Sequence, residues 1–204
     1  MNLSDIAALT IHDVKNQLAR LAGLAEQRGD HETVHVAIEA AAKLTALLIL
    51  DKAETGVLRP NIEAVAPTDL VDELVRETKG MRDGIVVEQD CRDAPTLAFF
   101  DSLLVRMALA NALNNALRYA SSRIRISVTE HDGYCVFTVS DNGNGYPESV
   151  LADSGATAGV SATGTGLGLR LAGRIAEQHE NRGRRGSIGL ANDGGAVFVM
   201  RLPM

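Results

Sequence analysis

The sequence predicts an α+β protein in two parts. Residues 1–58 are expected to form a helical hairpin that dimerises into a four-helix bundle, and residues 61–204 an α/β sandwich. Two observations support this. Before residue 55, apolar residues recur at alternating spacings of three and four, which is typical of amphipathic helices. After residue 61, segments that alternate apolar and polar residues lie between further helical segments, as in folds with helices packed on one face of a sheet.

The hairpin is predicted from two helices, at residues 3–28 and 31–54, joined by the polar turn RGDHE. Each helix carries one wide apolar stripe, and two antiparallel helices cannot bury two such stripes by themselves. A second copy of the chain would cover them, so a homodimer is expected. The alternative is that the hairpin packs on its own C-terminal domain. The stripes comprise Ile11, Val14, Leu18, Leu21 and Ala25 in the first helix, and Val34, Ile38, Ala41, Thr45 and Leu48 in the second.

The sandwich is predicted from three helices and five strands. Two pairs of strands flank the short turns HDG and DGG and are therefore expected to form hairpins. A stretch rich in Gly, Ala and Ser, residues 146–163, separates the two hairpins. The helices are expected at residues 68–80, 101–119 and 165–179, and the strands at residues 84–90, 122–130, 134–141, 186–192 and 196–203.

The composition excludes several classes of protein. A net charge of −6 argues against a nucleic-acid partner, which would usually face a basic surface. The longest apolar run, LTALLIL at residues 44–50, is far shorter than the roughly 20 residues of a membrane span. The N-terminus lacks the features of a signal peptide, and Cys91 and Cys135 lack the spacing of a metal site. A cytoplasmic protein without a membrane span is expected.

The first motif that can carry chemistry is NALNNALRYA, at residues 111–120. Asn111 and Asn115 lie one helical turn apart on one face, and Arg118 and Tyr119 follow. An asparagine oxygen is a neutral ligand that suits Mg²⁺ when phosphates already supply negative charge. Taken alone, the motif is better explained as a polar helix face.

The second motif is DNGNG, which ends a predicted strand. Asp141 can accept a hydrogen bond from an exocyclic amine such as that of adenine. Gly143 and Gly145 allow the backbone to approach a ligand closely. A plain turn is the alternative, because Asn-Gly is a common turn signal.

The third motif is GTGLGL, which opens a predicted helix at Gly164. Free backbone N–H groups at a helix start, with no side chains in the way, make an anion site. A glycine run of this kind is weak evidence by itself, and it does not follow the dinucleotide-fold pattern.

In this order, the three motifs resemble the N, G1 and G2 boxes of the histidine kinase ATP-binding domain, within the GHKL ATPase superfamily. The similarity covers residues 61–204 and includes the closing GSIGL and GGAVFVMRLP. It implies ATP and Mg²⁺ as cofactors. Asn115 would bind Mg²⁺, Asn111 would lie near the γ-phosphate, and Asp141 would contact adenine. The remaining residues around the nucleotide would be Arg118, Tyr119, Gly143, Gly145, Gly164, Thr165, Gly166, Leu167 and Gly168.

The resemblance also makes residues 146–163 a lid over ATP, although this segment lacks the phenylalanine common in such lids. An ATP site needs a phosphoryl acceptor, and this need changes the interpretation of IHDVKNQL, at residues 11–18. A lone helical histidine is usually only a polar residue. Here His12 precedes Asp13, and an adjacent carboxylate can orient an imidazole or take its proton.

The octapeptide resembles the phosphoacceptor helix of histidine kinases. By this resemblance His12 is phosphorylated and Asp13 is the general base. Asn16 and Gln17 are both candidates for the residue that orients water during dephosphorylation of the response regulator. The longer run resembles the citrate-type sensor kinases and the sporulation phosphotransferases.

The implied partner is the receiver domain of a response regulator. Only eleven residues precede His12, so input is expected from a separate sensor protein or a small ligand. Two alternatives remain. One is a histidine phosphotransferase or scaffold whose ATP-binding-like domain is inactive. The other is a GHKL serine kinase that sequesters a sigma factor.

Overall fold

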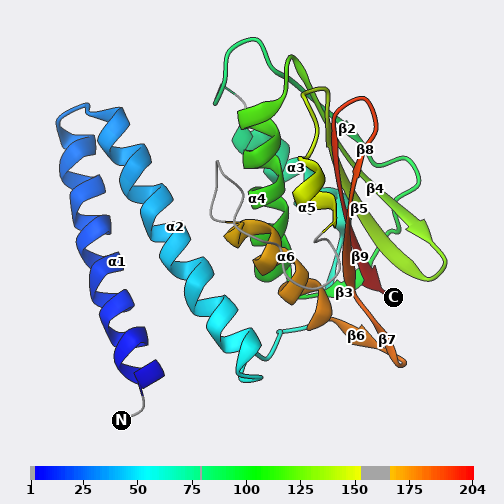
Figure 1. The fold of residues 1–204 in the computed structure, drawn as a ribbon, viewed down its shortest axis with the longest axis horizontal. Helices are drawn as coiled ribbons and strands as arrows, with labels where there is room; N and C mark the ends of the chain where they lie inside the picture. The colour runs from blue at the N-terminus through cyan, green and yellow to red at the C-terminus, as the bar shows by residue number, and fades with distance from the viewer. Residues whose placement is uncertain (1–2, 79, 153–165) are drawn as a thin grey trace. The chain divides into compact units, whose positions relative to one another are not determined.

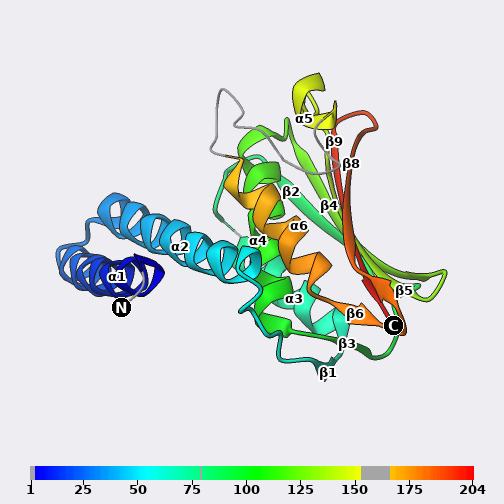
Figure 2. The ribbon, with the colours of Figure 1, turned by 60° about the horizontal axis from the view of Figure 1, so that its bottom comes forward.

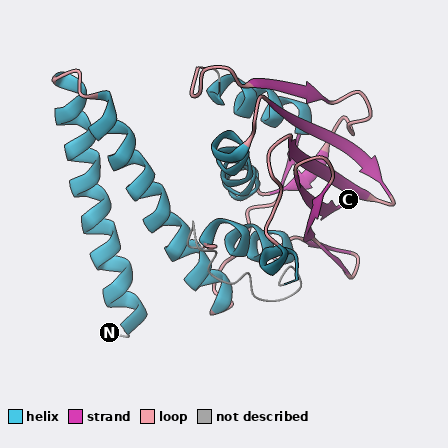
Figure 3. Ribbon diagram, turned by 45° about the horizontal axis from the view of Figure 1, so that its top comes forward, coloured by secondary structure: helices cyan, strands magenta, loops and turns pink. Residues whose placement is uncertain are grey.

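The computed structural model describes residues 3–78, 80–152 and 166–204, with side chains in the first helix from residue 9 onward. The chain divides into two compact units, Met1–Val57 and Leu58–Met204 (Figure 1). The first unit is entirely helical among the described residues, and the second mixes helices with strands (Figure 3). The predicted α+β class, with a helical hairpin followed by an α/β sandwich, is confirmed.

The first unit is an antiparallel hairpin of α1 (Leu3–Gln27) and α2 (His31–Glu54) (Figure 1). Asp30 caps α2, because its carboxylate accepts hydrogen bonds from the Thr33 N–H at 3.1 Å and the Thr33 hydroxyl at 2.6 Å. Gly56 follows the end of α2 with a φ of 67°, and the next N–H, of Val57, donates to the Lys52 carbonyl at 2.9 Å. This left-handed glycine ends the helix in a Schellman motif.

The hairpin covers only part of its apolar stripes. Ala25 and Ala37 are buried between the helices, whereas Val14, Leu21 and Ile38 are 37%, 46% and 60% exposed. The two helices therefore leave apolar surface uncovered within this unit. The exposed large apolar residues described in α1 and α2 are Leu9, Val14, Leu21, Leu24, Val36, Ile38 and Leu47.

Helix α2 is long and apolar enough, by length and composition alone, to cross a membrane, with a mean hydropathy of 1.6 over its most apolar window. It is the one such helix among the described residues. The prediction that no segment approaches a membrane span is therefore wrong on these two criteria. No long uninterrupted apolar run marks α2, because Glu39 and Lys43 lie within it. One helix of this kind is weak evidence for a membrane, since core helices of soluble proteins pass the same test.

The second unit is built on a mixed five-stranded sheet with the order β2-β4-β5-β9-β8. Strand β2 runs parallel to β4, and all other neighbours are antiparallel. Ile124, Ile126 and Val128 alternate along β4 with more exposed residues, so one face of the sheet is buried. The strands are β2 (Val86–Asp90), β4 (Arg123–His131), β5 (Tyr134–Asp141), β8 (Ser187–Asn192) and β9 (Ala196–Pro203).

Three helices cover the buried face of the sheet: α3 (Pro67–Thr78), α4 (Ser102–Tyr119) and α6 (Leu167–Glu177) (Figure 2). Between the helices and the sheet lies a core of aliphatic and phenylalanine side chains. The rings of Phe100 and Phe137 meet edge to face with centroids 5.8 Å apart. The core fixes α4 and α6, the helices that carry the first and third motifs, against the same sheet.

Five short elements were missed in the sequence. They are β1 (Glu63–Val65), which pairs with β3 (Ala98–Phe100), the pair β6 (Glu180–Asn181) and β7 (Arg184–Arg185), and α5 (Glu148–Ala152). Each has at most five residues. Segments so short cannot display a period of two or of 3.6, and their pairing depends on contacts with distant residues.

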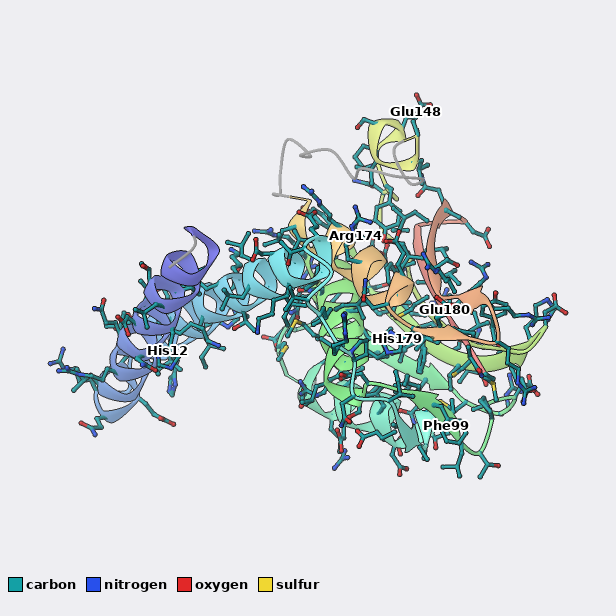
Figure 4. All side chains as sticks on the ribbon, turned by 90° about the horizontal axis from the view of Figure 1, so that it is seen from below. His12, Phe99, Glu148, Arg174, His179 and Glu180 are labelled. Carbon is teal, nitrogen blue, oxygen red and sulfur yellow. The ribbon has the colours of Figure 1, made fainter. Side chains whose placement is uncertain are left out.

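The start of α4 is tied to the end of α6 by His179, which is buried in the core (Figure 4). The His179 Nδ1–H donates to the Ile175 carbonyl at 2.8 Å, and Nε2 accepts from the Asp101 N–H at 3.0 Å. Asp101 caps α4 by accepting from the Leu104 N–H at 2.9 Å, and also accepts from the Asn61 N–H at 2.8 Å. Burial lowers the pKa of His179, which favours the neutral ring that this arrangement requires.

Candidate active site

The polar face of α4 is the first part of the candidate site. Asn111 and Asn115 are half-buried, and the residues between them that face the sheet, such as Ala112 and Leu113, are buried. Gly168 lies against this face, since a Cβ there would stand 3.5 Å from the Asn111 Cβ. The first turn of α6 is therefore next to the Asn111 side chain.

The asparagine side chains of α4 could ligate a magnesium ion only if phosphate oxygens supplied further ligands. The described residues contain no group of three or more His, Cys, Asp or Glu side chains that could hold a metal by themselves. Asn115 offers a neutral amide oxygen, which Mg²⁺ accepts as one ligand among several oxygens. Phosphate oxygens would have to supply the remaining negative charge.

The N-terminus of α6 is the second part of the site. Gly166 precedes the helix with a φ of 62°, and no side chain caps the helix there. The first backbone N–H groups, beginning at Leu167 and Gly168, have no partners within the helix, so they favour an anion. The predicted residues Gly164 and Thr165, and residues 153–163 of the expected lid, lie outside the described residues.

The loop DNGNG is the third part. The Asp141 Oδ1 accepts hydrogen bonds from the Gly143 N–H at 2.7 Å and the Ala196 N–H at 3.3 Å. Both contacts engage Oδ1, so among the described residues Oδ2 is the oxygen left to accept from a ligand. A Cβ on Gly143 would lie 2.2 Å from the Tyr119 carbonyl oxygen. A glycine is needed there because the loop touches the end of α4.

Two side chains that the sequence analysis did not single out fix this junction. The Asn142 Oδ1 accepts from the N–H groups of Ser122 and Arg123, at 3.0 and 2.9 Å, and so holds the loop to the start of β4. The Arg82 guanidinium donates to the carbonyl of Leu117, and to that of Arg118 at 3.1 Å. A cation at these carbonyls satisfies the C-terminal end of α4 and complements its dipole.

The acceptor candidate His12 lies on α1, in the other unit (Figure 4). Its side chain is 69% exposed and that of Asp13 is 67% exposed. The His12 Nδ1 is 3.7 Å from the Asp13 Oδ1 and 3.3 Å from the Asn16 Nδ2. Both neighbours therefore face the same ring nitrogen. Gln17 is also exposed, but it stands one residue further around the helix.

Comparison with known proteins identifies the second unit. Residues 100–204, about half of the chain, match the family described as histidine kinase-, DNA gyrase B-, and HSP90-like ATPase. The chain belongs to this ATPase family. Its helical hairpin followed by an ATPase domain is the fold of a histidine kinase core.

Curated relatives of this ATPase are sensor kinases. The signal transduction histidine-protein kinase AfsQ2 of Streptomyces coelicolor is 39% identical over 112 residues, which are 52% of this chain and 20% of that protein. The sensor protein QseC of Salmonella typhi is 29% identical over 97% of this chain and 44% of that protein. The chain thus spans less than half the length of these two relatives.

A solved structure shares the fold over both units. Full-length ShkA in complex with AMPPNP superposes with a TM-score of 0.76 at 20% identity, over 98% of this chain and 45% of ShkA. At this identity the likeness concerns the fold.

Within the ATPase domain, the structure brings together two pairs of the residues predicted from different motifs. Gly168 lies beside the Asn111 side chain, and Gly143 lies close to the Tyr119 carbonyl, since a Cβ at either glycine would meet these atoms. Arg118 and Tyr119 are exposed at the end of α4. The predicted acceptor His12 and base Asp13, and the two candidates for dephosphorylation, Asn16 and Gln17, belong to the first unit. The contributions of Arg82 and Asn142 could not be found in the sequence, because each residue acts on a segment that is distant along the chain.

Proposed function

We propose that the chain is a protein-histidine kinase. It transfers the γ-phosphoryl group of Mg-ATP to His12, and from there to an aspartate on the receiver domain of a response regulator. The observation that carries this proposal is the exposed His12 with Asp13 and Asn16 at its Nδ1, in a chain whose second unit is an ATPase domain.

The arrangement at His12 supports attack by Nε2. A proton on Nδ1, facing the Asp13 carboxylate, leaves the Nε2 lone pair as the nucleophile. In this tautomer Nδ1 cannot accept from the Asn16 amide, so the Asn16 side chain would turn its oxygen rather than its Nδ2 toward the ring. A bond forms between Nε2 and the γ-phosphorus, while the bond to the β–γ bridging oxygen breaks and ADP leaves. The ring becomes cationic during attack. The Asp13 carboxylate stabilises that charge and then takes the Nδ1 proton.

The ATPase domain would hold the nucleotide by three contacts. Asp141 Oδ2 would accept from the adenine amine, the α6 N-terminus would bind phosphate oxygens, and Asn115 would ligate Mg²⁺. Bound Mg²⁺ would offset the charge of the phosphates, and Arg118 would add a cation nearby. In-line phosphoryl transfer depends mainly on such positioning and charge neutralisation. The relative ShkA was crystallised with an ATP analogue, AMPPNP.

The hairpin would dimerise into a four-helix bundle. The exposed apolar side chains of α1 and α2, among them Leu21 and Ile38, require a cover, and a second hairpin offers a matching surface. A membrane is a less favourable cover for α2. The Glu39–Lys43 ion pair, at 2.8 Å, lies near the middle of α2, where charges in a bilayer are costly. This part of the proposal places the kinase core in the cytoplasm as a soluble dimer.

The same helix would also support dephosphorylation of the response regulator. Asn16 is the better placed of the two candidates, because it shares a face with His12 and approaches its ring at 3.3 Å. Gln17 shares its face with Asp13 instead. Replacement of each residue by alanine, followed by measurement of regulator dephosphorylation, would assign the role.

Labelling with γ-labelled ATP tests the kinase. The wild-type chain should acquire a phosphoryl group that is labile in acid and stable in base, and His12→Gln should not. His35→Gln is the matched control, because His35 is another exposed histidine on a helix. Label retained in His12→Gln would contradict the acceptor assignment. If ATP does not label the chain but a phosphorylated regulator does, the chain is a phosphotransferase. If ATP leaves an acid-stable label on a partner protein, the chain is a serine kinase.

A further inference from the structure

The side chain of Asn192, at the end of β8, holds the backbone of Tyr146. The Asn192 Oδ1 accepts a hydrogen bond from the Tyr146 N–H at 2.7 Å, and the Asn192 Nδ2 donates one to the Tyr146 carbonyl at 2.9 Å. A primary amide offers a donor and an acceptor side by side, so it pairs with one residue's backbone much as a neighbouring strand would. Tyr146 directly follows the DNGNG loop. The pair therefore fixes the far end of that loop.

Gly145 makes room for Asn192. Its φ is 79°, and a Cβ there would lie 2.7 Å from both the Cγ and the Oδ1 of Asn192. Real Cβ atoms essentially never come so close to another heavy atom. A side chain at position 145 would therefore displace the Asn192 amide from Tyr146, and the positive φ also favours glycine there.

The β8–β9 hairpin also fixes the start of the DNGNG loop, at Asp141. The Ala196 N–H donates to the Asp141 Oδ1 at 3.3 Å, and a Cβ on Gly195 would lie 1.9 Å from the Asp141 carbonyl oxygen. Burial, and after it the charge of Asp141, raise the pKa of Tyr146 to about 12, so the neutral phenol lies within the field of that carboxylate. The turn between β8 and β9 therefore contacts both ends of the segment that presents Asp141.

We propose that Asn192 is a positioning residue for adenine recognition. It acts through the loop: by holding Tyr146, it keeps Asp141 Oδ2 in the orientation that accepts the adenine amine. This inference rests on the proposed nucleotide site. Without the Asn192 amide the loop retains its tie at Asp141 and loses the one at Tyr146, so the carboxylate would spend less time in the accepting orientation.

The test compares two nucleotides in the intact chain, ATP and purine riboside triphosphate, which lacks the 6-amino group. In Asn192→Ala, ATP should bind roughly five- to tenfold more weakly, as expected for the loss of oriented hydrogen bonds. The affinity for purine riboside triphosphate should stay nearly the same, because that ligand does not use the Asp141 contact. The KM for ATP should rise while kcat for autophosphorylation changes little. Asn181→Ala, an asparagine of the β6–β7 hairpin, is the matched control and should bind both nucleotides as the wild type does.

A loss of affinity that is equal for both nucleotides would overturn the inference, because general loosening of the domain does not distinguish the amine. An unchanged affinity for ATP would overturn it as well. Asn192→Asp, which keeps the acceptor and loses the donor, should also weaken ATP binding selectively, and wild-type binding by this variant would count against the proposal. Failure of the wild-type chain to bind ATP would instead refute the proposed function.

Discussion

Asp101 joins three elements of the ATPase domain, so its replacement by alanine gives a prediction whose size can be worked out. Its carboxylate accepts from the Leu104 N–H at 2.9 Å and the Asn61 N–H at 2.8 Å, and the residue is buried. Loss of a helix N-cap costs about 1 kcal/mol. Loss of a hydrogen bond to a charged group costs about 1.5–3 kcal/mol. The free energy of unfolding of the domain should therefore fall by about 2.5–4 kcal/mol.

Denaturant unfolding followed by circular dichroism measures this change as a shift in the midpoint of the ATPase domain transition. Asp30→Ala is the matched control, because Asp30 also caps a helix through a carboxylate but is exposed and belongs to the hairpin. It should cost about 1 kcal/mol, in the hairpin alone. A loss below about 1 kcal/mol in Asp101→Ala would refute the reasoning, since it would mean that the second hydrogen bond contributes nothing to stability.

Three further predictions follow from the structure. Burial lowers the pKa of His179 below its usual 6.5, so the unfolded chain binds the proton more readily than the folded chain. The free energy of unfolding should therefore be highest above about pH 6.5 and fall as the pH drops below it. In His179→Gln the free energy of unfolding should differ less between pH 7.5 and pH 5.5 than in the wild type, and a difference as large as in the wild type would contradict the assignment. Arg82→Ala should lower the affinity for ATP, measured by calorimetry, because the C-terminal end of α4 loses its contact with the guanidinium. Arg82→Lys keeps the charge but not the planar guanidinium group, so it should recover the affinity only in part. Wild-type affinity in the alanine variant would rule out a role of Arg82 in positioning α4. Asn115→Ala should abolish the Mg²⁺-dependent part of ATP binding, and the same dependence on Mg²⁺ as the wild type would contradict the metal assignment.

Much of the fold could be predicted because each of its longer helices and strands shows a regular spacing of apolar residues within its own segment. Apolar spacing along α1 and α4 predicts helices wherever they pack, and alternation along β4 and β5 predicts a hairpin around HDG. The pairing of β2 with β4 and of β1 with β3 could not be predicted in this way. Each pair joins segments that are separated in sequence by one helix and one strand. Short strands carry too little pattern to identify a distant partner.

The candidate site shows the same division. The sequence by itself determined which chemical groups are present and in what order: two asparagines one turn apart, an aspartate before two glycines, a glycine-rich helix start, and His12 beside Asp13. Only the tertiary structure decided how they are held. Asn192 meets Tyr146 across 46 residues of sequence, and His179 meets Asp101 across 78. Contacts of this kind depend on how the sheet brings distant strands together, and no local pattern of residues records that arrangement.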